Sequence, residues 1–251
     1  MAIQPIDLSG RTILVVGASS GIGEATARAI ASGGGAVIAS ARRGDLLASL
    51  VDSLPGTGHL SLPLDASDAE AVTKSVGGLP ETARPIHGAV FCVGGHMLRP
   101  LRMTSAQHYS DMFRQNVLSV TNFFPPLSRL WGEQASVVLV SSAARFRGGT
   151  AAGAYAAAKE ALVGLARAWA CELAPRIRVN SVSPGVVRTP MTEKFLGSVG
   201  AKAAEEIEKR HPLGIGNPGQ VASAITFLLS GHASWVTGTD LAVDGGFAIQ
   251  G

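Results

Sequence analysis

The sequence has few cysteines and few aromatic residues, and each shortage excludes a class of protein. Its 251 residues include only Cys92 and Cys171, and neither has a CxxC or histidine-rich neighbourhood. A disulfide framework or structural zinc site is therefore not predicted, no metal is expected, and both thiols are expected to be buried. Aromatic residues make up 5% of the chain, whereas glycine and alanine are abundant, which favours a tightly packed α/β protein.

Charge and long apolar runs are also scarce. Charged residues make up 16% of the chain and the formal net charge is +3. Basic residues are scattered except for the pairs Arg42/Arg43 and Arg145/Arg147, so no nucleic-acid partner is predicted. No apolar run approaches the roughly 20 residues that span a bilayer, and the first ten residues lack the order of a secretory signal. We therefore expect no membrane partner and a cytoplasmic location.

Short apolar runs and longer helical patterns alternate along the whole chain. The short runs predict seven strands, at 12–16, 36–40, 59–64, 88–93, 136–141, 178–182 and 240–243. Helical spacing predicts helices at 21–31, 46–53, 66–76, 105–131, 153–173, 202–209 and 220–229. This alternation predicts a doubly wound, Rossmann-type parallel sheet of about seven strands with helices on both faces.

One domain over residues 1–251 is expected, because no repeat or low-complexity linker interrupts the pattern. Pro125 and Pro126 lie inside the predicted helix 105–131 and should bend or split it. The section 184–218 has no clear strand, and long excursions of this kind tend to be functional lids. We therefore predict a substrate lid at about 186–215.

A glycine-rich turn follows the first predicted strand. Gly17 permits a tight turn, Gly21 lets the backbone approach a pyrophosphate, and Gly23 allows close helix–strand contact. An ordinary turn would look similar, but its place at the first strand–helix junction favours a dinucleotide site. The predicted contacts here are Gly17, Ser19, Ser20, Gly21, Ile22 and Gly23.

The GxxxGxG spacing resembles the short-chain dehydrogenase/reductase family, and the resemblance covers nearly all of the chain. Further motifs of that family are matched by Asp65, Asn116, Ser142, Tyr155, Lys159, Asn180, Pro184-Gly185 and the segment from Val243 to Gly246. The resemblance implies further cofactor contacts from Asp65, Ala66, Gly94, Tyr155, Lys159, Pro184, Gly185, Val187 and Thr189. Among these, Asp65 would bind the adenine amino group, or instead cap the following helix. The backbone at Val187 and the hydroxyl of Thr189 would hold the nicotinamide carboxamide.

The end of the second predicted strand favours NADP(H) over NAD(H). NAD specificity usually needs a carboxylate there, and Ala41 occupies the family's acidic position. Arg42 can pair with a 2′-phosphate and Arg43 adds a second cation, although both arginines would also suit a solvated loop. Ser20 stands where many NADP-preferring relatives carry a basic residue, which leaves a partial preference open.

Tyr155 and Lys159 are four residues apart in a helical pattern and should share one face. An unperturbed phenol has a pKa of about 10, and a neighbouring ammonium stabilises the phenolate. Such pairs arise often by chance, but Ser142 closes the fifth predicted strand at the family's spacing. The resemblance implies that Ser142 orients a carbonyl, Tyr155 exchanges its proton and Lys159 binds the nicotinamide ribose. The resemblance also implies that Asn116 holds a water molecule that relays the proton, although Asn116 could instead simply kink its helix.

Two positions depart from the family pattern. Cys92-Val93-Gly94-Gly95 replaces Asn-Asn-Ala-Gly, and Val16 replaces a threonine. Polar groups at these places help tie the first and fourth strands together in relatives. We expect a coupled apolar replacement that leaves no unpaired buried polar group, because losing one partner alone would cost about 1–3 kcal/mol.

The expected function is NADP(H)-dependent oxidoreduction of a small carbonyl or alcohol substrate, in a homotetramer or homodimer. An enoyl reductase is disfavoured, because such relatives usually place the lysine more than four residues beyond the tyrosine. A non-catalytic NADP(H)-binding regulator or scaffold is the alternative. Arg145 and Arg147 could bind an acidic substrate or be merely solvated, and His96 is expected in a pocket wall or at the surface. The tail 247–249 is a candidate subunit contact.

Overall fold

The computed structural model describes residues 6–147 and 149–250, so residues 1–5, 148 and 251 of the predicted domain lie outside the described part. Seven parallel strands form one sheet in the order β3-β2-β1-β4-β5-β6-β7. They are β1 Thr12–Val16, β2 Ala36–Ala41, β3 Leu60–Pro63, β4 Ile86–Phe91, β5 Trp131–Val140, β6 Ile177–Pro184 and β7 Asp240–Val243. The predicted doubly wound sheet is confirmed.

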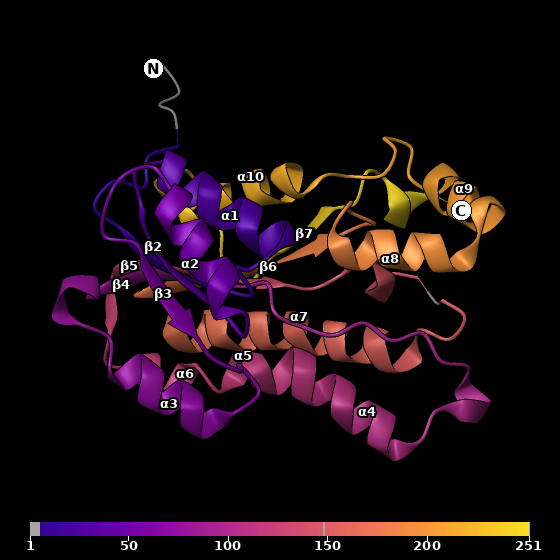
Figure 1. Ribbon diagram of the computed structural model, residues 1–251, viewed down its shortest axis with the longest axis horizontal. Helices are drawn as coiled ribbons and strands as arrows, with labels where there is room; N and C mark the ends of the chain where they lie inside the picture. The colour runs from indigo at the N-terminus through magenta and orange to yellow at the C-terminus, as the bar shows by residue number, and fades with distance from the viewer. Residues whose placement is uncertain (1–5, 148, 251) are drawn as a thin grey trace.

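Helices cover both faces of the sheet (Figure 1). One layer holds α1 Gly21–Ser32, α2 Gly44–Ser53 and α10 Pro218–Leu229. The other holds α3 Ala69–Gly77, α4 Ala106–Phe113, α5 Ser119–Thr121, α6 Phe124–Leu127 and α7 Gly153–Leu173. Two further helices, α8 Pro190–Val199 and α9 Ala201–Lys209, project beyond the sheet at the right of Figure 1.

The sheet is buried on both faces because its side chains alternate between two apolar clusters. Ile13 and Val15 of β1 pack under α1 and α10, whereas Leu14 and Val16 pack toward α3 and α7. The chain order reverses between β1 and β4, which are neighbours in the sheet. A crevice is expected at the carboxyl ends of the strands at such a switch point.

The predicted helix 105–131 is wrong in its extent. The helix α4 ends at Phe113, a π-helical segment spans Arg114–Leu118, and α5 and α6 follow as short pieces. The two prolines lie in the first turn of α6, where proline is tolerated, and Trp131 already belongs to β5. A split at the prolines is therefore confirmed, but helical spacing concealed both the π-helical segment and the strand beyond.

The expectation that Val16 leaves no unpaired polar group is also wrong. Val16 is the register partner of Ser40 on β2, so both side chains point to the same face. The buried Ser40 hydroxyl has no hydrogen-bond partner among the described residues. Val93 packs on the same cluster as Val16, whereas Cys92 packs on the opposite one. The apolar replacement therefore joins Val16 to Val93, and Ser40 carries the unpaired group.

No helix within residues 6–147 and 149–250 is both long and apolar enough to cross a membrane. Across the same residues, no group of three or more His, Cys, Asp or Glu side chains is placed to hold a metal ion.

Candidate active site

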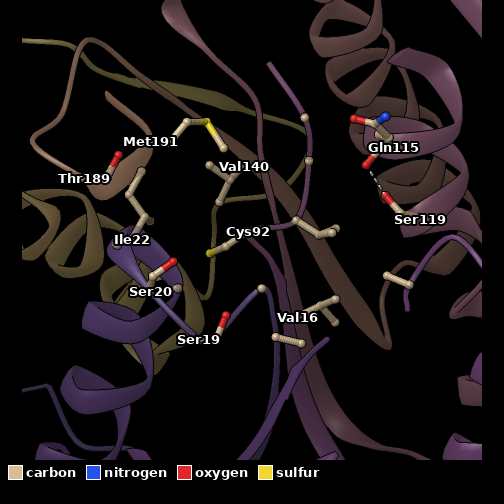
Figure 2. A pocket seen from close by; sticks show the side chains of 18 of the residues that line it. Val16, Ser19, Ser20, Ile22, Cys92, Gln115, Ser119, Val140, Thr189 and Met191 are labelled. Atoms are coloured by element: carbon tan, nitrogen blue, oxygen red, sulfur yellow. Dashed lines mark hydrogen bonds between the residues drawn. The ribbon is translucent and has the colours of Figure 1, made fainter. Parts of the chain in front are cut away.

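A cleft of about 800 Å³ opens at the carboxyl ends of the strands. Figure 2 shows Ser19, Ser20 and Ile22 on one side of it and Gln115 with Ser119 on the other. The structure brings together at this cleft all of the predicted cofactor contacts: Gly17, Ser19, Ser20, Gly21, Ile22, Gly23, Arg42, Arg43, Asp65, Ala66, Gly94, Tyr155, Lys159, Pro184, Gly185, Val187 and Thr189. Ser142 lines it too, whereas Asn116 lies fully buried behind the wall.

The glycine-rich turn leaves the start of α1 open to a ligand. A Cβ at Gly23 would collide with the carbonyl of Gly17, so the helix can approach the turn this closely only without a side chain. Ser20 is the N-cap residue and makes no side-chain cap hydrogen bond. The first amides of a helix have no intrahelical acceptor, and they attract anions. The turn therefore presents free donors to the cleft.

Arg43 is exposed and is hydrogen-bonded to that turn. Its Nη2 donates to the hydroxyls of Ser19, at 2.8 Å, and Ser20, at 2.9 Å. Arg42 lines the cleft beside it. An arginine that follows β2 thus contacts Ser20, and Arg42 and Arg43 both line the cleft where the sequence lacks a carboxylate.

Asp65 does not cap the following helix. It binds the amide of Ser67, at 2.9 Å, and the Ser67 hydroxyl, at 2.8 Å. These hydrogen bonds, with the nearby Arg42 and Arg114, hold the pKa of Asp65 below its ordinary value. Asp68 caps α3 instead, by accepting from two backbone amides, so the carboxyl of Asp65 remains at the cleft edge.

Ser142, Tyr155 and Lys159 converge at the inner end of the cleft. Burial raises the pKa of the Tyr155 phenol, and a hydrogen bond with Ser142 partly offsets that rise. Burial also lowers the pKa of Lys159 to about 8. The Lys159 ammonium donates to the carbonyl of Val140, at 2.9 Å, and lies 6.0 Å from the centre of the Tyr155 ring. A phenol, a hydroxyl and a buried ammonium thus share one low-dielectric site.

Asn116 points its side chain toward this group from the π-helical segment. Its Nδ2 donates to the carbonyls of Met112, at 2.9 Å, and Gly95, at 3.2 Å. Its buried Oδ1 has no partner in the described part of the chain. A Cβ at Gly94 would collide with that oxygen and lie 3.2 Å from the Lys159 Nζ. Asn116 thus lies within the interruption of the helix and directs an acceptor toward the site, and its role with a relay water stays a prediction.

The three side chains considered for the substrate pocket, Arg145, Arg147 and His96, each have partners within the chain. Arg145 is committed to ion pairs with Glu160 and Asp240, each at 2.7 Å, and is not available for an acidic substrate. Arg147 donates to the carbonyl of Phe247, at 3.1 Å. His96 packs edge-on against Tyr155, with ring centroids 4.8 Å apart, and burial is the main cause that lowers its pKa.

Among the residues that line the cleft, Ser67, Arg114, Gln115 and Ser119 were not predicted from the sequence. Arg114 and Gln115 immediately precede the predicted Asn116. Met191 and Thr192 also line the cleft and lie within the predicted lid 186–215, at the start of α8, a helix that was not predicted. Figure 2 places Met191 beside Thr189, on the side of the cleft opposite Gln115.

The two cysteines differ in their exposure. Cys92 lines the cleft, where burial raises its pKa to about 12 and keeps it a neutral thiol. Cys171, expected to be buried, is exposed on α7.

Comparison with known proteins identifies the family. A family model described as enoyl-(acyl carrier protein) reductase matches residues 17–248. The chain is 35% identical over 250 residues to the 3-oxoacyl-(acyl-carrier-protein) reductase of Thermotoga maritima, covering 96% of this chain and 99% of the relative. This chain belongs to the short-chain dehydrogenase/reductase family. Its members are oxidoreductases.

Two further similarities support membership of the short-chain dehydrogenase/reductase family. L-xylulose reductase of Bos taurus is 34% identical over 245 residues, covering 96% of this chain and 97% of the relative. A solved structure of a putative NAD(P)-dependent gluconate 5-dehydrogenase from Beutenbergia cavernae, with bound NADP, has a TM-score of 0.89 at 30% identity. That match covers 98% of this chain and all of the other.

The cleft of this short-chain dehydrogenase/reductase fits the nicotinamide dinucleotide that its family uses. The uncapped start of α1 at Ser20 suits a pyrophosphate, and Arg43 places positive charge beside it. At the other end, the unpaired Asn116 oxygen and the Lys159 ammonium offer an acceptor and donors.

Proposed function

We propose that this protein is an NADP(H)-dependent enzyme that interconverts a carbonyl and an alcohol on a small substrate. The observation that carries the proposal is the meeting of Ser142, Tyr155 and Lys159 at the inner end of the cleft, with an Asn116 oxygen behind them that has no partner among the described residues. The names of the reductases and dehydrogenases it resembles support the same reaction class.

Each residue has a defined part in this chemistry. A bound nicotinamide supplies or accepts the hydride. The Ser142 hydroxyl orients the carbonyl oxygen, and the Tyr155 phenol gives that oxygen its proton, or takes one from an alcohol. The Lys159 ammonium, held by the Val140 carbonyl, stabilises the phenolate and binds the nicotinamide ribose. Asn116 holds the water through which the proton exchanges with solvent.

The preference for NADP(H) rests on Arg42 and Arg43. A 2′-phosphate at the end of β2 would meet both guanidiniums and the two serine hydroxyls that Arg43 already binds. A free 2′-hydroxyl would find no carboxylate, because Ala41 stands in its place. The NADP in the gluconate 5-dehydrogenase structure supports this reading.

Substitutions that remove the charges of Arg42 and Arg43 test the preference for NADPH over NADH. Arg42→Ala with Arg43→Ala should raise the KM for NADPH about tenfold or more, since each charge-assisted hydrogen bond contributes roughly 1.5–3 kcal/mol. The KM for NADH should change little. Ala41→Asp is the matched variant and should improve NADH use. Equal loss with both cofactors would contradict the proposed role of the arginines.

The two competing functions are less well supported. Reduction of a C=C bond is the activity in the family model's description, but Lys159 stands four residues after Tyr155, closer than is usual in enoyl reductases. A non-catalytic binding protein would have no need of a buried ammonium beside a buried phenol. Ser142, Tyr155, Lys159 and Asn116 are all present.

The decisive test is Tyr155→Phe, assayed by NADPH absorbance against a panel of ketones and aldehydes. Turnover should fall by at least about 100-fold, because general acid catalysis contributes roughly 10²–10⁴, while NADPH binding should persist. Tyr109 is the only other tyrosine in the chain, so Tyr109→Phe is the matched control and should retain turnover. Activity that survives Tyr155→Phe would overturn the mechanism. Tight NADPH binding without turnover of any ketone or aldehyde in the panel would favour the alternative function, a non-catalytic NADP(H)-binding regulator.

We also propose that residues 186–215 act as a substrate lid on a single-domain enzyme. The helices α8 and α9 lie in this section, and Met191 and Thr192 reach the cleft. Phe195 of α8 packs against His96, with ring centroids 5.6 Å apart. Since His96 also contacts Tyr155, the lid rests against the catalytic group through one imidazole.

A further inference from the structure

His211 is a buried histidine outside the catalytic group. It follows α9 and is only 3% exposed. Its Nε2 lies 3.1 Å from the amide nitrogen of Val186, and its Nδ1 lies 2.8 Å from the carbonyl oxygen of Ile207. Both polar atoms of the ring are therefore satisfied by backbone groups from two different segments.

These partners determine the tautomer. The Val186 amide can only donate, so Nε2 accepts; the Ile207 carbonyl can only accept, so Nδ1 carries the proton. The ring is the neutral Nδ1–H form. One nitrogen thus holds the segment after β6, and the other holds α9.

The segment held by Nε2 lines the cleft. Its other backbone hydrogen bonds reach two distant positions. The Gly185 amide donates to the Val243 carbonyl, at 3.2 Å. The Val186 carbonyl accepts from the amide of Gly216, at 3.0 Å, and the Arg188 amide donates to the Gly216 carbonyl, at 2.9 Å. A Cβ at Gly185 would lie 3.0 Å from the His211 Nε2 and 2.9 Å from the backbone of Asp244. The chain therefore passes through a gap that His211 defines on one side.

The C-terminal segment fixes the imidazole in place. The ring of Phe247 stacks on His211, with centroids 4.9 Å apart and an interplanar angle of 24°. Arg147, from the loop after Ser142, donates to the Phe247 carbonyl. In the tail 247–249, a candidate subunit contact, Phe247 packs within its own chain and Ile249 is 86% exposed.

We infer that His211 is a positioning residue for the cofactor. By accepting from the Val186 amide, it fixes the backbone at Val187 that would hold the nicotinamide carboxamide. By donating to Ile207, it ties that backbone to α9 of the lid. Lid position and cofactor affinity are coupled through one neutral ring. This inference rests on the proposed nicotinamide site.

Two substitutions separate the positioning role from simple packing. Gln is long enough for His211→Gln to place an amide oxygen where Nε2 lies, and so to accept from Val186. His211→Asn ends near the position of Nδ1 and keeps only the bond to Ile207. His232 is exposed, so His232→Asn is the surface control.

Hydrogen exchange of the Val186 amide and NADPH affinity are the two readouts. His211→Asn should speed exchange at Val186 without cofactor and weaken NADPH binding about five- to tenfold, the worth of one hydrogen bond. His211→Gln should keep most of the protection of the Val186 amide and most of the NADPH affinity. His232→Asn should match the wild type in both measurements. KM for NADPH should rise in the Asn variant more than kcat falls.

Three outcomes would overturn the inference: unchanged Val186 exchange in His211→Asn, equal NADPH affinity in the Asn and Gln variants, or a lower melting temperature with unchanged affinity. If both variants fail to fold, ¹⁵N chemical shifts of the wild-type imidazole decide. A protonated Nε2 contradicts the arrangement, whereas a protonated Nδ1 with an unprotonated, hydrogen-bonded Nε2 supports it. Wild-type protein that binds no NADPH would instead refute the proposed function.

Discussion

Burying the ammonium of Lys159 costs the fold free energy, because a charge leaves water for an apolar site. The pKa falls from an ordinary 10.5 to about 8, which corresponds to roughly 3 kcal/mol at neutral pH. Its hydrogen bond to Val140 fixes its place without removing that cost. The burial of Lys159 therefore lowers the stability of the fold at a residue that the proposed reaction requires.

Lys159→Met should therefore stabilise the protein while abolishing turnover. The folded state has the lower pKa, so between about pH 8 and 10.5 the unfolded state binds more protons and wild-type stability rises with pH. The gain from the substitution should be about 1–3 kcal/mol at pH 7 and should shrink above pH 8. Urea unfolding at pH 7, 9 and 10 measures it, with the exposed Lys202→Met as control. A destabilised Lys159→Met protein at pH 7 would contradict the argument.

Among the elements, the short 3₁₀ turn Ala143–Arg145 after β5 is anchored by one arginine. Arg145 joins this turn to Glu160 on α7 and to Asp240 on β7, and the Asp240 carboxylate also accepts from Ser183. The Arg145 and Asp240 side chains are only 10% and 4% exposed. The turn that begins at Ser142 is thereby fixed to two elements distant in sequence.

Arg145→Met should destabilise the fold by about 3–5 kcal/mol, because it leaves the Asp240 carboxylate buried without its cation. Thermal or urea unfolding measures the loss. The exposed pair Arg28–Glu24 on α1 provides the matched control, and Arg28→Met should cost about 1 kcal/mol or less. Similar losses in the two variants would show that the Arg145 network does not anchor the turn.

Elements with strong periodicity were predicted closely, and those that depend on distant contacts were not. The strand β1 and the helix α7 have the bounds that their patterns predicted. The helix α8 was missed because it lies among glycines and prolines and buries none of its residues. The π-helical segment at Asn116 was missed because side-chain spacing barely changes when one backbone hydrogen bond shifts.

For the whole molecule, three large apolar side chains in the C-terminal part of the chain are strongly exposed. Trp235 is 99% exposed, Leu213 87% and Ile249 86%, and β7 is the last strand of the sheet. Large exposed apolar groups mark interaction surfaces. We keep a homotetramer, or a homodimer, as the proposed assembly; a cytoplasmic location stays a prediction.

Trp235→Asp should lower the mass measured by light scattering to that of a smaller assembly, because a charge would be buried at the contact. Trp235→Phe keeps an apolar ring and should retain the wild-type mass. Since the indole is fully exposed, neither change should disturb the core of the monomer. A wild-type protein that is monomeric at micromolar concentration would refute the proposed assembly.

The sequence alone determined the sheet and the glycine-rich turn, because these depend on local periodicity and on fixed spacing within single elements. The resemblance to the family supplied the candidate catalytic residues. Tertiary structure decided what each side chain has for a partner. It tied Arg43 to Ser19 and Ser20, committed Arg145 to a buried ion pair, and left the hydroxyl of Ser40 unpaired beside Val16. Such partners lie on other strands and helices, and only packing in three dimensions brings them within hydrogen-bonding distance.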